Sequence, residues 1–65
     1  MTFKINDTVR LLVDFPEDAL AKGTIGVVVK EYTKPDEAYE VEFCNDKGET
    51  IAQIAVRPTQ IALVA

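Results

Sequence analysis

The side chains best suited to chemistry are carboxylates gathered in the middle of the chain. Glu40 and Glu42 are two residues apart, so on a β-strand both would point to the same face. Glu37 precedes them, and Asp46 and Glu49 follow in what looks like a hairpin turn that could bring Glu49 near the pair. Three interpretations remain open: a solvated face that keeps the protein soluble, a surface that binds another protein, and a weak metal or catalytic site.

The rest of the sequence argues against an enzyme. An active site needs a base, a nucleophile or a metal, yet the chain contains no histidine and no serine. Cys44 is the single cysteine, and Glu42 and Asp46 beside it would disfavour its thiolate. We interpret Cys44 as a half-buried apolar side chain and predict no catalytic residue, no cofactor and no metal site.

Two glycines and two tyrosines have structural explanations. Gly23 and Gly26 have the spacing of a phosphate loop, but a valine run follows them instead of a lysine and a helix, so we expect backbone roles. Tyr39 is expected in the core, whereas Tyr32, at a strand end, is expected to be exposed and to contact a binding partner. Without tryptophan, the aromatic groove that binds proline-rich peptides is not expected.

Charge and composition restrict the partner and the compartment. The formal net charge is −4 with seven scattered Lys and Arg residues, which disfavours nucleic acids and anionic membranes. One cysteine excludes an internal disulfide, and the N-terminal residues reach charge before any apolar run. We therefore expect a cytoplasmic protein whose partner is another protein, with a basic surface as the preferred complement.

Short apolar segments separated by turn signals predict an all-β protein in a single domain over residues 1–65. In residues 7–14, Val9, Leu11 and Val13 alternate with more polar side chains, and in residues 38–44 Tyr39, Val41 and Phe43 do the same. A structured loop is expected over 15–23; it contains one helical turn over 17–22 that Gly23 stops, and its Phe15 and Leu20 pack on the core. The remaining expected elements are strands over 23–32, 49–56 and 61–64 and a 3₁₀ turn over 58–60.

This order of elements is that of a five-stranded SH3-like barrel with a long first loop and a 3₁₀ turn before the last strand. The alternative is an open, strongly bent sheet that closes only by dimerising. Leu12 is an apolar residue on the polar side of the first strand, and the final run is apolar on both faces. Leu12, Leu63 and Val64 are thus either barrel-closing residues or the seam of a homodimer.

Several ordered stretches together resemble an uncharacterised family of very short bacterial proteins, catalogued as a domain of unknown function. The stretches are Asp-Thr-Val-Arg-Leu at 7–11, Phe-Pro-Glu-Asp at 15–18, Lys-Gly-Thr-Ile-Gly-Val-Val at 22–28, Tyr-Glu-Val-Glu-Phe at 39–43, Asp-Lys-Gly-Glu-Thr at 46–50 and Arg-Pro-Thr-Gln-Ile at 57–61. The resemblance covers residues 4–64 and implies no activity. It implies an association with mobile gene cassettes and toxin–antitoxin pairs.

We therefore expect a non-catalytic protein-binding module, with the antitoxin or immunity member of a gene pair as its most specific form. The expected contact residues are Tyr32, Glu37, Glu40, Glu42 and Glu49. The alternative is a nucleic-acid-binding or ribosome-associated SH3-like barrel, because residues 23–28 are similar to a short motif of such domains and of nitrile hydratase subunits. The net charge opposes this alternative.

Overall fold

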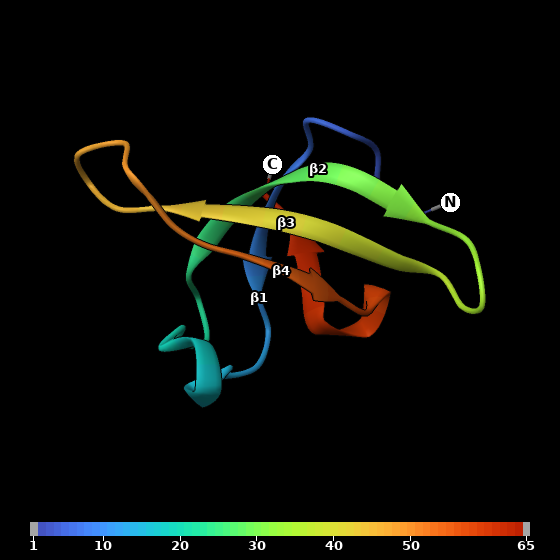
Figure 1. The fold of residues 1–65 in the computed structure, drawn as a ribbon, viewed down its shortest axis with the longest axis horizontal. Helices are drawn as coiled ribbons and strands as arrows, with labels where there is room; N and C mark the ends of the chain where they lie inside the picture. Colours follow the sequence, from blue (N-terminus) through green and yellow to red (C-terminus); the bar gives the residue numbers. More distant parts are fainter. Residues whose placement is uncertain (1, 65) are drawn as a thin grey trace.

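The computed structural model describes residues 2–64 as five β-strands and two 3₁₀ helices, with no α-helix (Figure 1). The all-β prediction is confirmed for this part of the chain. No helix among these residues has the length and hydropathy of a membrane span. In chain order the elements are β1 (Thr8–Leu11), η1 (Pro16–Asp18), β2 (Ile25–Tyr32), β3 (Ala38–Cys44), β4 (Thr50–Val56), η2 (Pro58–Gln60) and β5 (Ile61–Leu63).

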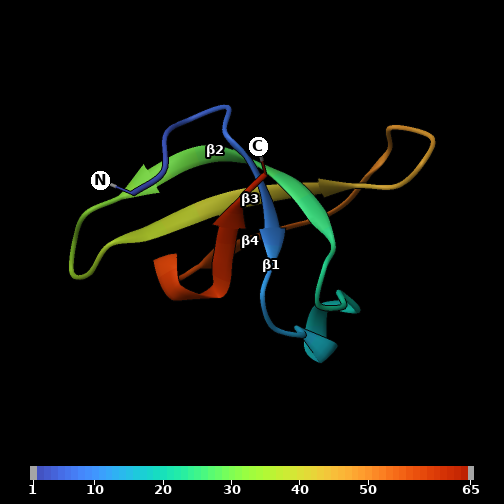
Figure 2. The same ribbon diagram turned by 180° about the vertical axis from the view of Figure 1, so that it is seen from behind.

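The strands form one antiparallel sheet in the order β4-β3-β2-β1-β5. The sheet bends so strongly that β1 and β5 cross behind β2, β3 and β4 at a steep angle, and the view from behind shows the same crossing (Figures 1 and 2). Within the described residues β4 and β5 do not pair with each other. The sheet is therefore open at both of its outer strands.

Alternation along the strands builds the core between the two halves of the bent sheet. Tyr39, Val41 and Phe43 are fully buried, as their period-2 spacing predicts, and Val9 and Leu11 meet them from β1. Val13, the third residue of the expected inward set, is exposed because β1 ends at Leu11. The other buried apolar side chains are Phe3, Leu20, Val28, Val56 and Ile61.

Gly26 allows β2 to approach β3 where the sheet bends. A Cβ atom at this position would lie 2.7 Å from side-chain atoms of both Phe43 and Val41, and 2.8 Å from the carbonyl oxygen of Glu42. No other residue type fits such a distance without displacing the neighbouring strand. The backbone role expected for Gly26 is thus confirmed, and it is the close approach of two strands.

The long loop before β2 closes one end of the core. Its helical turn starts at Pro16 and ends at Asp18, earlier than expected, because Ala19 adopts a left-handed conformation with φ 56°. Phe15 and Leu20 exchange backbone hydrogen bonds of 2.8 and 3.0 Å, and Leu20 is buried. These two hydrogen bonds fix both ends of the helical turn, so that Phe15 and Leu20 pack on the core as expected.

Candidate functional site

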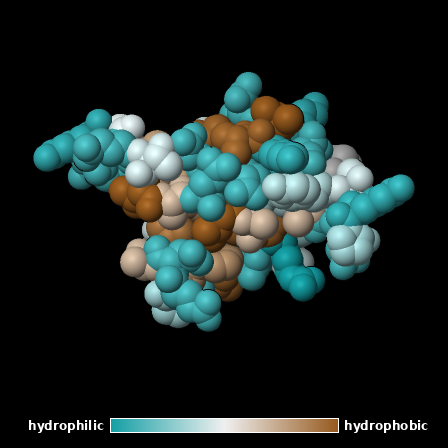
Figure 3. Space-filling model, in the orientation of Figure 1, coloured by the Kyte–Doolittle hydropathy of each residue, from teal (hydrophilic) through white to brown (hydrophobic). Residues whose placement is uncertain are grey.

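The outer side of the β2–β3 pair carries the carboxylates singled out from the sequence. Because Tyr39, Val41 and Phe43 point inward, Glu40 and Glu42 point outward from β3. Residues in register on β2 share that face. We call the set Val27, Lys30, Tyr32, Glu40 and Glu42 the outer β2–β3 face. In Figure 1 β2 and β3 lie in front of β1 and β5, so the outer side of this strand pair faces the viewer there and in the same orientation in Figure 3.

One half of this face is already bonded internally. The Tyr32 hydroxyl donates a 3.1 Å hydrogen bond to Oε1 of Glu40, and Lys30, opposite Glu40 in the ladder, places its Nζ 5.1 Å from the centre of the Tyr32 ring. The hydrogen bond to Glu40, followed by desolvation, raises the pKa of Tyr32. The structure thus brings Tyr32 and Glu40 together, as two of the five residues predicted for partner contact.

The other half of the face is a carboxylate among neutral neighbours. Glu42 stands in register with Val27 on one side and Gln53 on the other, and its Oε2 accepts a 2.6 Å hydrogen bond from the hydroxyl of Thr50. Val27 is 37% exposed although valine is apolar. The sequence did not single out Val27, because three consecutive valines carry no alternation; only the strand register reveals its exposure.

Glu37 serves the core instead of this outer face. Its carboxylate accepts a short hydrogen bond from the hydroxyl of Tyr39, a fully buried side chain that points inward. The same hydroxyl accepts a 3.2 Å hydrogen bond from the Phe3 N–H, and the Phe3 ring packs edge-on against the Tyr39 ring. Burial, followed by the bond to Glu37, raises the pKa of Tyr39. Glu37 therefore holds the Tyr39 hydroxyl, and Tyr39 in turn anchors the N-terminal segment to β3.

Glu49 lies in the β3–β4 turn and is held there. Nδ2 of Asn45 donates a 2.9 Å hydrogen bond to Oε1 of Glu49, while Oδ1 of Asn45 accepts from the backbone N–H groups of Lys47 and Glu49 at 2.9 and 3.0 Å. Gly48 takes φ +79°, a left-handed conformation that glycine adopts readily in turns. Of the four predicted glutamates, only Glu40 and Glu42 share the outer face of one strand.

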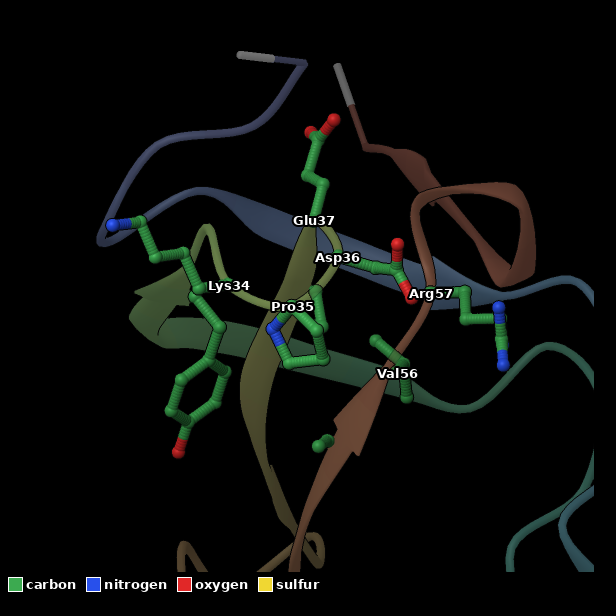
Figure 4. A pocket seen from close by; sticks show the side chains of 9 residues that line it. Lys34, Pro35, Asp36, Glu37, Val56 and Arg57 are labelled. Atoms are coloured by element: carbon green, nitrogen blue, oxygen red, sulfur yellow. The ribbon is translucent and has the colours of Figure 1, made fainter.

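A pocket of about 360 Å³ adjoins the Tyr32 end of this face. Pro35 and Val56 lie at its centre, whereas the side chains of Lys34 and Arg57 point away from each other on opposite sides (Figure 4). Asp36 lies between them. No signal in the sequence indicated the pocket, because its two sides come from segments about twenty residues apart.

The remaining candidates lie elsewhere. Cys44 is exposed at the end of β3, so the interpretation as a half-buried side chain was wrong; it follows the inward Phe43, and the alternation along β3 therefore points it outward beside the exposed turn. Leu63, opposite Val9, is 57% exposed, and Val64 is also exposed; Leu12 is half-buried at the other end of the β1–β5 ladder. Among residues 2–64, no group of three potential metal-ligating His, Cys, Asp or Glu side chains is present.

Comparison with known proteins adds a family and no activity. A family model described as a domain of unknown function (DUF4926) matches residues 5–63, a range that includes all five strands. No curated protein and no solved structure matches the chain. The chemistry of the surface is therefore the remaining guide to function.

Proposed function

The chain belongs to the family described as a domain of unknown function (DUF4926), and we propose that it acts as a non-catalytic module that binds a basic partner protein through the outer β2–β3 face. The observation that carries this proposal is the setting of Glu42. Its ladder neighbours, Val27 and Gln53, bring no positive charge to it. A lysine or arginine of a partner would supply that charge.

The apolar surface beside Glu42 specifies the kind of partner group. Lysine and arginine carry a long aliphatic stem below their charge, and such stems pack along exposed apolar side chains. Val27 offers that apolar contact next to the Glu42 carboxylate, and Ile25, also exposed, extends it along β2. A basic side chain crossing β2 toward β3 would satisfy both features at once.

Glu40 and Tyr32 would contribute the second part of the contact. Lys30 offsets part of the Glu40 charge, so this half of the face is closer to neutral than the Glu42 half. The adjoining pocket, with Pro35 and Val56 at its centre, gives room for an apolar side chain of the partner. Glu37 and Glu49 are left with structural roles in this proposal, because Glu37 bonds to the buried Tyr39 hydroxyl and Glu49 lies in the β3–β4 turn, so neither belongs to the outer β2–β3 face.

An antitoxin or immunity protein is the specific form of this function that we favour. Such a protein would cover the basic substrate-binding surface of a nuclease, and its carboxylates would accelerate association by electrostatic steering. The net charge of −4 supports attraction to a basic partner from a distance. The localisation that follows is cytoplasmic.

The proposed fold of this module is a half-open SH3-like barrel. Three features support it: β5 returns to lie beside β1, η2 directly precedes β5, and the strongly bent β2 pairs with β1 at one end and β3 along most of its length. A barrel of this kind presents the outer side of its strands as a rigid surface, which suits a preformed binding face.

Capture from the native host with charge-reversal variants tests the proposal. The double variant Glu40→Lys/Glu42→Lys should lose the partner that the wild type captures. The matched control is Glu17→Lys/Asp18→Lys, which makes the same charge change on the exposed η1 turn. Equal capture by all three proteins would show the outer β2–β3 face to be the wrong surface, and equal loss by both variants would show that only the net charge matters.

A further inference from the structure

The outermost strand β4 has an unprotected edge. Its seven residues, Thr50–Val56, contain no charged residue and no proline, although these are the features that usually keep exposed edge strands from pairing with other chains. A bulge is present, but only at the end of the strand near the β3–β4 turn. The strand is also more than twice as long as β5, the three-residue edge on the other side of the sheet.

The direction of the β4 backbone groups follows from the ladder. Both backbone groups of Val28 bond toward the β1 side: its N–H donates to the Asp7 carbonyl at 2.9 Å, and its carbonyl accepts from the Asn6 N–H at 2.7 Å. Val28 and Val41 are opposite each other, so the groups of Val41 must point toward β4, where Ile54 is its partner.

The alternating direction of backbone groups along a strand then identifies which N–H and C=O groups of β4 are free. Because Ile54 bonds toward β3, the N–H and C=O groups of Gln53 and Ala55 point away from the sheet. Among residues 2–64, none of these four groups has a hydrogen-bond partner outside the strand ladder. The β4 edge thus presents two adjacent donor–acceptor pairs in the spacing that an incoming antiparallel strand would use.

We propose that this edge pairs with β4 of a second copy of the chain, antiparallel and with Gln53 opposite Gln53. In this register each Gln53 exchanges two backbone hydrogen bonds with its counterpart, and the two amide side chains can bond to each other. The pairing joins the two sheets into one continuous sheet and uses the full length of Thr50–Val56. This inference is independent of the partner-binding function proposed above.

The side chains of β4 complement themselves in this register. Ile51, which is 52% exposed, would lie opposite Ala55 of the second copy, so a large side chain meets a small one. Ile54 and Ala52 make the same kind of pair on the inner face. At each end of the strand Glu49 would lie opposite Arg57 of the second copy, which brings opposite charges together. A parallel pairing would instead place Glu49 beside Glu49.

Two further observations favour this register and this edge. Centring the register on Ala55 instead would place Arg57 opposite Gln53 within the paired strands, but the N–H of Arg57 already donates to Oε1 of Gln60 at 2.8 Å. The outer β2–β3 faces of the two copies would be separated by both β4 strands, so the β3 carboxylates would lie about 14 Å apart. That distance exceeds the Debye length of about 8 Å at physiological salt, and repulsion between them is therefore weak.

Sedimentation equilibrium with charge variants of Gln53 tests the proposal. The wild type should reach twice the 7.2 kDa mass of one chain as its concentration rises from about 10 μM to 1 mM. Gln53→Lys and Gln53→Glu should each weaken association by roughly tenfold or more, because like charges then meet at the two-fold axis. An equimolar mixture of the two should dimerise again. A wild type that stays monomeric at 1 mM, or single variants as dimeric as the wild type, would overturn the proposal.

Disulfide cross-linking tests the register separately. In a Cys44→Ala background, Gln53→Cys should form a disulfide-linked dimer under mild oxidation, since opposite residues of an antiparallel pair lie about 5.5 Å apart at Cα. Ala55→Cys is the matched control on the same strand and the same face, and it should remain largely unlinked. Equal cross-linking of both, or preferential linking of Ala55→Cys, would overturn the Gln53-centred register.

Discussion

The hydroxyl of Tyr32 donates a 3.1 Å hydrogen bond to Oε1 of Glu40 across the β2–β3 ladder. This bond ties the end of β2 to the outward carboxylate of β3, and it favours the protonated phenol because only the protonated form can donate a hydrogen bond to the carboxylate. Both partners are among the residues that the sequence predicted for partner contact. Because the bond raises the pKa of Tyr32, a titration of tyrosine absorbance can detect it.

We predict that Glu40→Gln lowers the pKa of Tyr32 toward its ordinary value, because the variant removes the charge and the strong acceptor together. Alkaline titration of tyrosinate absorbance in a Tyr39→Phe background measures Tyr32 alone. Glu37→Gln in the same background is the control and should leave Tyr32 unchanged, since Glu37 bonds to the other tyrosine. An unchanged Tyr32 titration in Glu40→Gln would contradict the observed bond.

Stability should fall on the alkaline side because of Tyr39. Its folded-state pKa is raised above the unfolded value of about 10. The protonated phenol therefore stabilises the fold fully below pH about 10, and this contribution is lost as the pH rises toward the folded-state pKa. Thermal unfolding as a function of pH should show a steeper alkaline decline for the wild type than for Tyr39→Phe. If the stability of both proteins declined in parallel with pH, the effect would belong to groups other than Tyr39.

Gly26→Ala should destabilise the domain by about 1–3 kcal/mol, the usual cost of overpacking a core. The added methyl group would overlap Phe43, Val41 and the backbone of Glu42, and the last of these has little freedom to move. Gly48→Ala is an informative control, because it meets no atom within 4 Å and is strained only by its φ of +79°. Urea unfolding should rank Gly26→Ala as the more damaging; the reverse order would argue against close approach of β2 and β3.

Asn45→Ala should cost about 1–2 kcal/mol of stability, because three hydrogen bonds of one side chain define the β3–β4 turn. Asp46→Ala, in the same exposed turn, removes a neighbouring polar side chain and should change the free energy of unfolding by less than about 0.5 kcal/mol. Denaturant titration of both variants measures the difference. Similar values for the two would mean that the turn does not depend on the Asn45 side chain.

Much of the fold was predictable where one local signal dominates. The bounds Ala38–Cys44 match the expectation because inward apolar and outward polar residues alternate without interruption, and Pro58–Gln60 matches because proline starts a turn efficiently. Val13 was misplaced because nothing local marks the end of β1. The Leu12 N–H bonds to the Gln60 carbonyl, a contact from the far end of the chain that the local alternation of residues 7–14 does not encode.

The candidate site was predictable in part for the same reason. Alternation sufficed to place Glu40 and Glu42 outward, but the exposure of Val27 depends on the β2–β3 register and its irregularity between Val28 and Lys30. The role of Glu37 depends on a buried tyrosine hydroxyl that needs an acceptor. The free β4 edge depends on the order of all five strands, which follows from the complete topology and not from the sequence of β4.

The most direct test of the central claim is the association rate of the captured partner with three proteins at low and physiological salt. We predict that Glu40→Lys/Glu42→Lys slows association by roughly tenfold or more at low salt, with a smaller difference when salt screens the charges. The control Glu17→Lys/Asp18→Lys, with the same net charge, should retain most of the wild-type rate. Equal rates for the two variants at both salt concentrations would contradict a binding role for the outer β2–β3 face.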